Sequence, residues 1–245
     1  MIKIIINGAC GRMGKKITEL AKEKSDIFEI AALADVTGAD GCIADITSFD
    51  GAADVIIDFS HHTAVNTLIP YAQKRGLPIV IATTGHTDEE MEYIRKSSET
   101  VAIFKSSNMS LGVAVLSRLA KQAAALFPDA DIEIVETHHN RKIDSPSGTA
   151  VLLADSIKEV RPEATCVYGR SGISKRTQNE IGMHSIRMGN IAGIHEVIIG
   201  TDTETITLKH EAHDRALFAD GALTAAKFMA GKPAGLYSMQ DIVEF

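Results

Sequence analysis

The stretch that decides the fold is "IIINGACGRMG", residues 4–14, in which an apolar run leads directly into a loop with glycine at every third position. These glycines are Gly8, Gly11 and Gly14, and Cys10 stands where the common dinucleotide fingerprint has its second glycine. A glycine-rich turn between a strand and a helix lets backbone N–H groups and the helix N-terminus approach a pyrophosphate. The alternative is a tight turn that serves packing alone. We interpret the stretch as the strand, turn and helix of a nucleotide site.

The rest of the first hundred residues alternates short apolar runs with segments of helical period, the pattern of parallel strands joined by crossover helices. It predicts strands at 2–6, 30–34, 55–59, 79–82 and 101–104, and helices at 13–24, 63–75 and 88–97. After Asn108 the pattern changes to a helix at 111–127, a strand at 132–136, a helix at 150–160, a loop-rich segment at 168–185, alternating strands from 185 to 210 and a last helix at 217–229.

These patterns predict an α/β protein of two domains. The first is a Rossmann-type parallel sheet domain, formed by residues 1–109 and completed by the C-terminal segment 216–245. The second, residues 110–215, is an α+β domain with a mostly antiparallel or mixed sheet, because its last strands follow one another without helices. We expect this domain to bind the substrate and to form the oligomer.

Composition excludes several classes of protein. The 245 residues carry 32 acidic and 25 basic side chains, a formal charge of −7, so the chain has no bulk positive field for nucleic acid or an anionic membrane. Three cysteines, Cys10, Cys42 and Cys166, are too few and too scattered for a disulfide framework or a zinc site. No stretch approaches the roughly 20 apolar residues of a membrane span, and the N-terminus lacks the apolar centre of a signal peptide. We therefore expect a cytoplasmic protein.

An acidic residue at the end of the second strand supports nucleotide binding. Asp35 follows Gly14 by about 20 residues, the spacing at which a carboxylate accepts hydrogen bonds from a ribose diol. The two residues after Asp35 supply no arginine for a 2′-phosphate, which favours NADH, whereas Arg12 and two nearby lysines could still hold that phosphate. The alternative for Asp35 is a solvated turn residue. Three further strand ends, "DFSHHT" at 58–63, "ATTGHT" at 82–87 and "KSSNMS" at 105–110, place small polar residues at the edge of the sheet where ligands bind.

The densest stretch of reactive side chains is "ETHHNRKIDSPSGTA", residues 136–150. It offers two histidines, which give protons near neutral pH, and two cations, Arg141 and Lys142, which hold carboxylates. Backbone amides of residues 147–149 open the next helix and could bind a second anionic group. The stretch predicts a small substrate with more than one carboxylate. Simple N-caps at Ser147 or Thr149, and a polar strand end at the histidines, are the alternatives.

Two other chemistries fit the sequence less well. His61, His62, His138 and His139 form two pairs, but neither pair has a carboxylate or cysteine at metal-ligand spacing, so we predict no metal. The chain also lacks the Gly-x-Ser-x-Gly element of a serine hydrolase.

The motifs "GACGRMG", "DFS", "ATTG", "SNMSLGV" and above all "HHNRKIDSPSGTA" resemble, in order and spacing, the bacterial dihydrodipicolinate reductases of the diaminopimelate and lysine pathway. The resemblance extends to the C-terminal "GKPAGLYSMQDIVEF". It implies reduction of 4-hydroxy-tetrahydrodipicolinate to tetrahydrodipicolinate with loss of water, NADH or NADPH as the cofactor, and a homotetramer. The alternatives are another NAD(P)-dependent oxidoreductase of a small amino or keto acid, or a non-catalytic nucleotide-sensing protein.

The resemblance also implies roles for individual residues. His138 takes the proton donor's position and Lys142 the second active-site position. The implied substrate contacts are His139, Ser147, Gly148 and Thr149. The implied cofactor contacts are Gly8, Ala9, Cys10, Gly11, Arg12, Met13, Asp35, Ala82, Thr83, Thr84, Ser106, Ser107, Asn108 and Met109.

Overall fold

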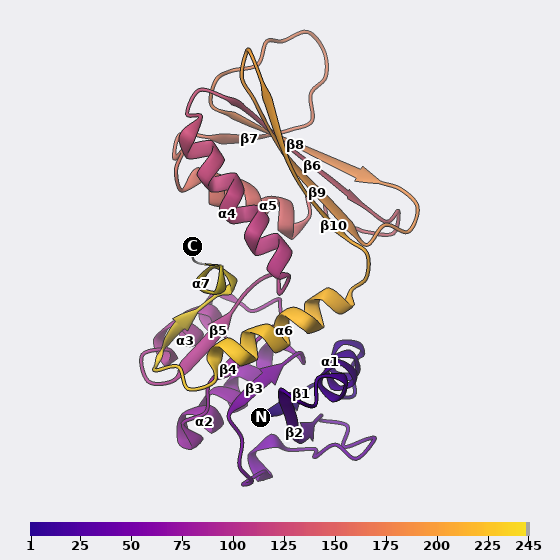
Figure 1. The fold of residues 1–245 in the computed structure, drawn as a ribbon, viewed down its shortest axis with the longest axis vertical. Coiled ribbons are helices and arrows are strands. Elements are labelled where there is room, and N and C mark those ends of the chain that lie inside the picture. Colours follow the sequence, from indigo (N-terminus) through magenta and orange to yellow (C-terminus); the bar gives the residue numbers. More distant parts are fainter. Residues whose placement is uncertain (244–245) are drawn as a thin grey trace. The chain divides into compact units, whose positions relative to one another are not determined.

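The computed structural model describes residues 1–243 and contains two compact units (Figure 1). The first comprises Met1–Ser110 and the C-terminal segment from Ala216 onward, and the second comprises Leu111–Arg215. Within the described residues, no helix has both the length and the apolar character needed to cross a membrane.

The first unit is built on a parallel sheet of six strands in the order β11-β5-β4-β3-β1-β2, which confirms the predicted Rossmann-type arrangement. The strands are β1 (Ile2–Asn7), β2 (Phe28–Ala34), β3 (Val55–Asp58), β4 (Ile79–Ile81), β5 (Ala102–Lys105) and β11 (Gly235–Tyr237). The sequence pattern missed β11, a short edge strand. Apart from Ile2 at the start of β1, the isoleucines of β1, β3 and β4 are fully buried, because helices cover both faces of a parallel sheet.

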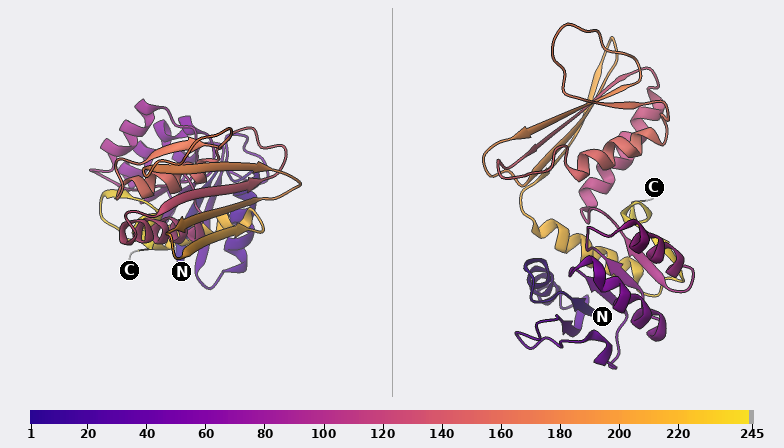
Figure 2. Two further views of the ribbon diagram at one scale, coloured as in Figure 1. Left: turned by 90° about the horizontal axis from the view of Figure 1, so that it is seen from above. Right: turned by 180° about the vertical axis from the view of Figure 1, so that it is seen from behind.

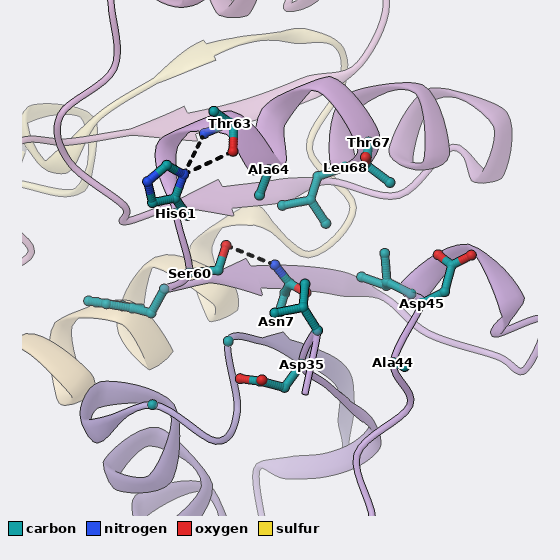
Figure 3. Close-up of a pocket in the computed structure, with 15 residues that line it drawn as sticks. Asn7, Asp35, Ala44, Asp45, Ser60, His61, Thr63, Ala64, Thr67 and Leu68 are labelled. Atoms are coloured by element: carbon teal, nitrogen blue, oxygen red, sulfur yellow. Dashed lines mark hydrogen bonds between the residues drawn. The ribbon is translucent and has the colours of Figure 1, made fainter. Parts of the chain in front are cut away.

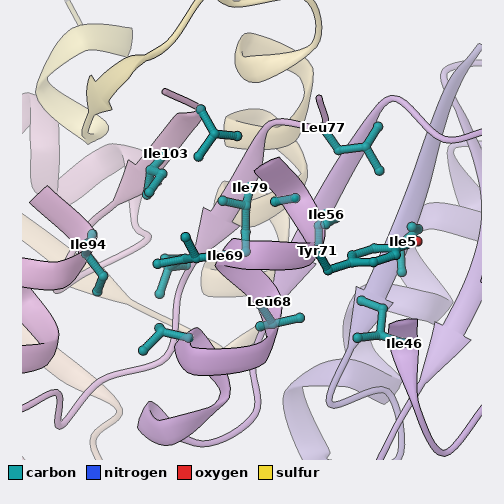
Figure 4. Close-up of a cluster of buried hydrophobic side chains, with 14 of the residues drawn as sticks. Ile5, Ile46, Ile56, Leu68, Ile69, Tyr71, Leu77, Ile79, Ile94 and Ile103 are labelled. Atoms are coloured by element: carbon teal, nitrogen blue, oxygen red, sulfur yellow. The ribbon is translucent and has the colours of Figure 1, made fainter. Parts of the chain in front are cut away.

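Helices α2 (Val65–Arg75) and α3 (Asp88–Ser97) lie on one face of this sheet, where they form a buried apolar cluster with its strands. Helices α1 (Arg12–Glu23) and α6 (Ala216–Met229) contact each other and are not part of this cluster. Figure 4 shows the first group, in which Leu68 and Ile69 of α2 pack with Ile56 and Ile79 of the sheet. A capping box between Thr87 and Glu90 fixes the start of α3. The remaining short elements are η1 (Ile46–Ser48), η2 (His62–Ala64) and α7 (Met239–Ile242).

The second unit has a five-stranded mixed sheet in the order β10-β9-β6-β8-β7, as the sequence predicted. Its strands are β6 (Asp131–His138), β7 (Thr165–Tyr168), β8 (Glu180–Arg187), β9 (Gly193–Gly200) and β10 (Thr205–Ala212). Strand β8 pairs in parallel with β6 and β7, whereas β9 pairs antiparallel with β6 and β10. Helices α4 (Leu111–Leu126) and α5 (Gly148–Lys158) cover one face (Figure 2).

The loop predicted at 168–185 is shorter than expected. Strand β7 ends at Tyr168 and β8 begins at Glu180, so only residues 169–179 form the connection. The glycines and charged residues of this segment suggested a longer loop, but Ile181 and Met183 are buried against the helices and draw the chain into the sheet.

Candidate active site

The glycine-rich loop joins β1 to α1, and its glycines are required by close backbone contacts. Gly8 has a φ of +80°, and a Cβ on it would lie 2.5 Å from the carbonyl oxygen of Phe59. A Cβ on Gly14 would lie 2.1 Å from the carbonyl oxygen of Gly8. Packing therefore explains these two glycines. Gly11 is the N-cap of α1 and lines a cavity beside the loop.

This cavity has a volume of about 550 Å³ and lies over the carboxyl ends of β1, β2 and β3 (Figure 3). Of the predicted cofactor residues, Gly8, Gly11 and Asp35 line it. Further lining residues are Asn7, Val36, Ala44, Asp45, Ile46, Phe59, Ser60, His61, Thr63, Ala64, Thr67 and Leu68. The other predicted cofactor residues lie outside its lining, in the glycine-rich loop, in the first turn of α1 or at the ends of β4 and β5, and Thr83 and Met109 are buried.

Asp35 is an oriented carboxylate at the end of β2. Its Oδ1 accepts hydrogen bonds from the backbone N–H and the hydroxyl of Thr37, at 3.0 and 2.7 Å, and its Oδ2 accepts from the N–H of Cys10 at 3.1 Å. The hydrogen bond from the Thr37 hydroxyl is the main cause of a lowered Asp35 pKa. The carboxylate is thus ionised and fixed between two loops of the cavity.

A buried polar network joins the other strand ends of the first unit. Asp58, fully buried, accepts hydrogen bonds from Asn7, Ser60 and Thr83, and burial raises its pKa. Lys105 donates to the backbone oxygen of Thr83 at 2.8 Å, and burial lowers its pKa to about 8. Neither Asp58 nor Lys105 was predicted as a site residue, although both belong to the polar strand ends "DFSHHT" and "KSSNMS".

In the second unit, His138 ends β6 and is held by a carboxylate that the sequence left without a role. Its Nδ1 lies 2.5 Å from Oε2 of Glu136. The two oxygens of Glu136 also accept two hydrogen bonds from the guanidinium of Arg187, at 2.7 and 2.8 Å, and one from the N–H of Ser147 at 3.1 Å. The side chain of Glu136 is 1% exposed, so this carboxylate is fully engaged inside the protein.

The charges of this cluster follow from its contacts. Burial alone would raise the pKa of Glu136, but hydrogen bonds led by those of Arg187 and His138 outweigh it and lower the pKa to about 2. Burial lowers the pKa of His138, against the opposing pull of Glu136. Because Glu136 is ionised, Nδ1 of His138 carries a proton and donates it in this bond. Its Nε2 is then the atom that gains or loses the proton, at a pH below that of an ordinary histidine.

A second buried histidine lies against the first. The rings of His138 and His195 meet edge to face with centroids 5.1 Å apart, and Nε2 of His195 is 3.1 Å from the hydroxyl of Ser147. Burial lowers the pKa of His195 to about 4, so the imidazole is neutral at physiological pH. His195, like Arg187, lies outside the motif that the sequence analysis examined.

Three of the four predicted substrate residues lie at the start of α5, whereas His139 follows the end of β6 and donates its N–H to the carbonyl of Ile191. Ser147 is its N-cap, with a hydroxyl that accepts the N–H of Ala150, and Gly148 and Thr149 form the first turn. Ser147 is thus an N-cap, and its N–H and hydroxyl are both engaged within the protein. The Nζ of Lys142 lies 2.8 Å from both carboxylate oxygens of Asp144.

Comparison with known proteins places the chain in a family. Profiles for the N-terminus and the C-terminus of dihydrodipicolinate reductase match residues 2–109 and 112–243. The chain belongs to the dihydrodipicolinate reductase family. It is 46% identical to the 4-hydroxy-tetrahydrodipicolinate reductase of Caldanaerobacter subterraneus subsp. tengcongensis, over 100% of this chain and 99% of that one. It is also 46% identical to the enzyme of that name from Clostridium tetani, over 98% and 96% of the two chains.

Solved structures agree with this assignment. Dipicolinate-bound dihydrodipicolinate reductase from Paenisporosarcina sp. TG-14 matches with a TM-score of 0.79 and 25% identity, over 99% of this chain and 100% of that one. A probable dehydrogenase from Thermotoga maritima matches at 0.61 and 12% identity, over 98% and 92% of the two chains, and shares the fold. The resemblance seen in the motifs is thus confirmed, as are the predictions of an oxidoreductase and of NADH or NADPH as its cofactor.

Proposed function

We propose that this chain catalyses the reaction for which its relatives are named, the NAD(P)H-dependent reduction of 4-hydroxy-tetrahydrodipicolinate to tetrahydrodipicolinate with loss of water. The observation that carries the proposal is the buried group formed by Glu136, His138 and Arg187 next to the N-terminus of α5. It joins a proton donor to an anion-binding helix start, and both are needed to reduce a small dicarboxylic acid.

The first unit fits the cofactor. Gly8 and Gly11 of its glycine-rich loop line the cavity, and Asp35 presents an ionised carboxylate to the same cavity. We propose residues 1–109 with the segment from 216 as the dinucleotide-binding domain. When bound, NADH or NADPH supplies the hydride. The proposed cofactor contacts are Gly8, Ala9, Cys10, Gly11, Arg12, Met13, Asp35, Ala82, Thr83, Thr84, Ser106, Ser107, Asn108 and Met109.

The catalytic roles follow from the second unit. Reduction leaves an electron pair on the substrate, and we assign its protonation to Nε2 of His138. Glu136 holds the other ring nitrogen at 2.5 Å and stabilises the imidazolium before the proton leaves. The positive charge of Lys142 binds a substrate carboxylate in exchange for its contact with Asp144.

The start of α5 binds the second carboxylate. The backbone N–H groups of Gly148 and Thr149 lie in its first turn, where the helix dipole favours a negative charge. Ser147 holds this turn in place, because its hydroxyl accepts the N–H of Ala150 and its own N–H donates to Glu136. His139 stands between His138 and Lys142 in sequence and completes the proposed set of substrate contacts.

NADH oxidation with freshly prepared 4-hydroxy-tetrahydrodipicolinate tests the proposal, with small amino and keto acids as comparison substrates. We expect turnover with the first alone. His138→Gln and Lys142→Ala should each lower turnover by orders of magnitude in a folded protein. Oxidation of NADH with an amino or keto acid only would support a different oxidoreductase, and binding of NADH without turnover on any of them would support a nucleotide sensor.

We propose that NADH serves at least as well as NADPH. The carboxylate of Asp35 is fixed in the cavity by Thr37 and Cys10, so it would repel a 2′-phosphate, and no arginine follows it in the chain. The ratio of kcat/KM for the two coenzymes measures this preference. A ratio tenfold in favour of NADPH would refute it, and Arg12→Ala would then identify the residue that binds the phosphate.

We further propose that the second unit forms a homotetramer in the cytoplasm. Helices α4 and α5 cover one face of its sheet, while Val135 and Ile198 on the other face are half-buried within a single chain. Apolar side chains on an uncovered sheet face favour burial against another copy. Light scattering coupled to size exclusion measures the mass, and a monomer at micromolar concentration would contradict this proposal.

A further inference from the structure

Two of the three cysteines, which are too few and too scattered in the sequence for a disulfide framework, lie side by side in the structure. The Sγ atoms of Cys10 and Cys42 lie 3.2 Å apart, although 32 positions separate the two residues in the chain. Both are free thiols. Cys10 belongs to the glycine-rich loop, and Cys42 to the segment 35–45 that follows β2. Neither cysteine lines the proposed nucleotide cavity, so the contact between the two sulfur atoms lies outside the lining of that cavity.

Backbone hydrogen bonds hold both thiols in this arrangement. The segment carrying Cys42 is fixed to β2, because the N–H of Ile43 donates to the carbonyl of Leu33 and its carbonyl accepts from Asp35. Cys42 itself donates its N–H to Ala39 at 2.9 Å. On the other side, the N–H of Cys10 donates to the carboxylate of Asp35 at 3.1 Å. The sulfur contact is therefore part of an ordered pair of loops.

The two thiols are not equivalent chemically. Burial, followed by the hydrogen bond with Cys10, raises the pKa of Cys42 to about 11, so Cys42 stays protonated at neutral pH. Both side chains are half-buried and leave access for a small reagent. The thiolate is the nucleophile in thiol–disulfide exchange, so the protonated Cys42 is suited to the second attack and not to the first.

We propose that Cys10 and Cys42 are a reversible disulfide site that reacts with low-molecular-weight disulfides. In the first step the thiolate of Cys10 attacks one sulfur of the disulfide, which forms a mixed disulfide and releases one thiolate. In the second step Cys42 loses its proton, attacks Sγ of Cys10 and releases the second thiolate. The two protons of the cysteine pair leave on the two released thiols. The protein is oxidised by two electrons and the small disulfide is reduced to two thiols.

Closing the bond moves the cofactor loop. The sulfur atoms must approach from 3.2 Å to about 2.05 Å, which draws Cys10 toward the segment 35–45. At Gly8 the loop cannot move toward β3, because Gly8 already packs against the carbonyl of Phe59. The displacement is therefore taken up by the N–H groups of the loop and by Asp35. The effect on cofactor binding rests on the proposed role of this loop, and we expect oxidation to weaken NADH binding.

The chemistry is tested on the full-length protein without any activity assay. Protein is incubated with oxidised glutathione, its remaining thiols are counted, and its peptides are mapped by mass spectrometry. We expect the thiol count to fall from three to one, with a peptide crosslinked between Cys10 and Cys42. Cys42→Ser should abolish the crosslink, whereas Cys166→Ser, which removes the cysteine of β7, should keep it. No crosslink, or one through Cys166, would overturn the proposal.

The consequence is tested by titrating NADH into the reduced and oxidised proteins and following its fluorescence. We expect the dissociation constant to rise about tenfold on oxidation and to return with dithiothreitol. The Cys42→Ser variant should bind NADH as the reduced protein does, with or without glutathione disulfide. Equal NADH affinity in the two states would overturn the effect on binding. A protein that forms the crosslink but never turns over the substrate would instead count against the proposed reaction.

Discussion

Replacing Glu136 with glutamine should move the pH profile of the reaction rather than simply lower the rate. Nδ1 of His138 lies 2.5 Å from the carboxylate, and the two side chains are 10% and 1% exposed. A close opposite charge raises a histidine pKa by about 1–3 units, so its removal lowers the pKa of His138 by that amount. A proton donor must be protonated in the free enzyme, and kcat/KM falls tenfold per pH unit above its pKa.

At a pH above the pKa of His138, kcat/KM of Glu136→Gln should therefore fall by about 10- to 1000-fold. On the acidic side, where the imidazole is protonated in both proteins, the two rates should converge. The more acidic imidazolium of the variant also transfers its proton more readily, which offsets part of the loss. The measurement is kcat/KM for the substrate from acidic to weakly alkaline pH in both proteins.

The same substitution costs stability, which must be measured alongside. The pKa of Glu136 is about 2 in the folded protein against 4.5 for an ordinary glutamate, equivalent to roughly 3 kcal/mol. Because the folded pKa is lowered, this contribution is complete above pH 4.5 and is lost as the pH falls toward 2. Circular dichroism at each assay pH identifies the range in which the variant is folded.

Glu133→Gln is the matched control. Glu133 stands on the same strand and accepts a hydrogen bond from His184 at 2.7 Å, but it has no contact with His138. Its substitution should leave the pH profile of kcat/KM in place. The reasoning is refuted if Glu136→Gln keeps the wild-type profile, or if it lowers kcat/KM by the same factor at every pH while the protein is folded.

Three further substitutions test other parts of the structure. Gly193→Ala would place a methyl group 3.1 Å from Nε2 of His138, so kcat/KM should fall at least about tenfold with an unchanged Tm. Gly200→Ala is the control and should be active, because its methyl group would have no atom nearer than 3.9 Å. The free energy of unfolding should rise between pH 8 and 10.5, because the pKa of Lys105 is lowered in the folded protein and the unfolded chain binds this proton more tightly. Urea titrations across this pH range should show a smaller rise for Lys105→Met than for the wild type. Arg161 donates to the backbone carbonyls at and beyond the end of α4, so thermal unfolding of Arg161→Met should show that the free energy of unfolding is lower by about 2–4 kcal/mol. A change within about 0.5 kcal/mol, the usual range for a surface substitution, would contradict this role.

Local periodicity was enough to predict most of the fold. Strands β1 to β5 and helices α1 to α4 have apolar residues at the spacing that is typical of a strand or a helix, and each of these elements forms in the structure. The missed strands are β7 and β11, of four and three residues. Strand β4 is equally short but is a buried run of β-branched residues, whereas β7 and β11 are partly exposed and lack such a run. Each exists because a neighbouring strand supplies its hydrogen bonds.

The candidate site shows the same limit in its side chains. The histidine-lysine motif could be found because its members are neighbours in the sequence, but the groups that set their charge are not. Arg187 lies beside His138 through the parallel pairing of β8 with β6, and His195 lies beside Glu136 through the antiparallel pairing of β9 with β6. A shift of one residue in either register would turn these side chains to the other face of the sheet.

The register of β6 thus determines the acid–base chemistry as well as the packing. Alternate residues of this strand, Ile132 and Ile134, are fully buried in the apolar cluster under α4 and α5, and the same alternation carries Glu136 and His138 into the protein. The apolar residues thereby fix the depth at which the carboxylate and the imidazole lie. That depth removes water from the pair, so burial lowers the pKa of His138, while Glu136 raises it and the charge of Arg187 lowers it further.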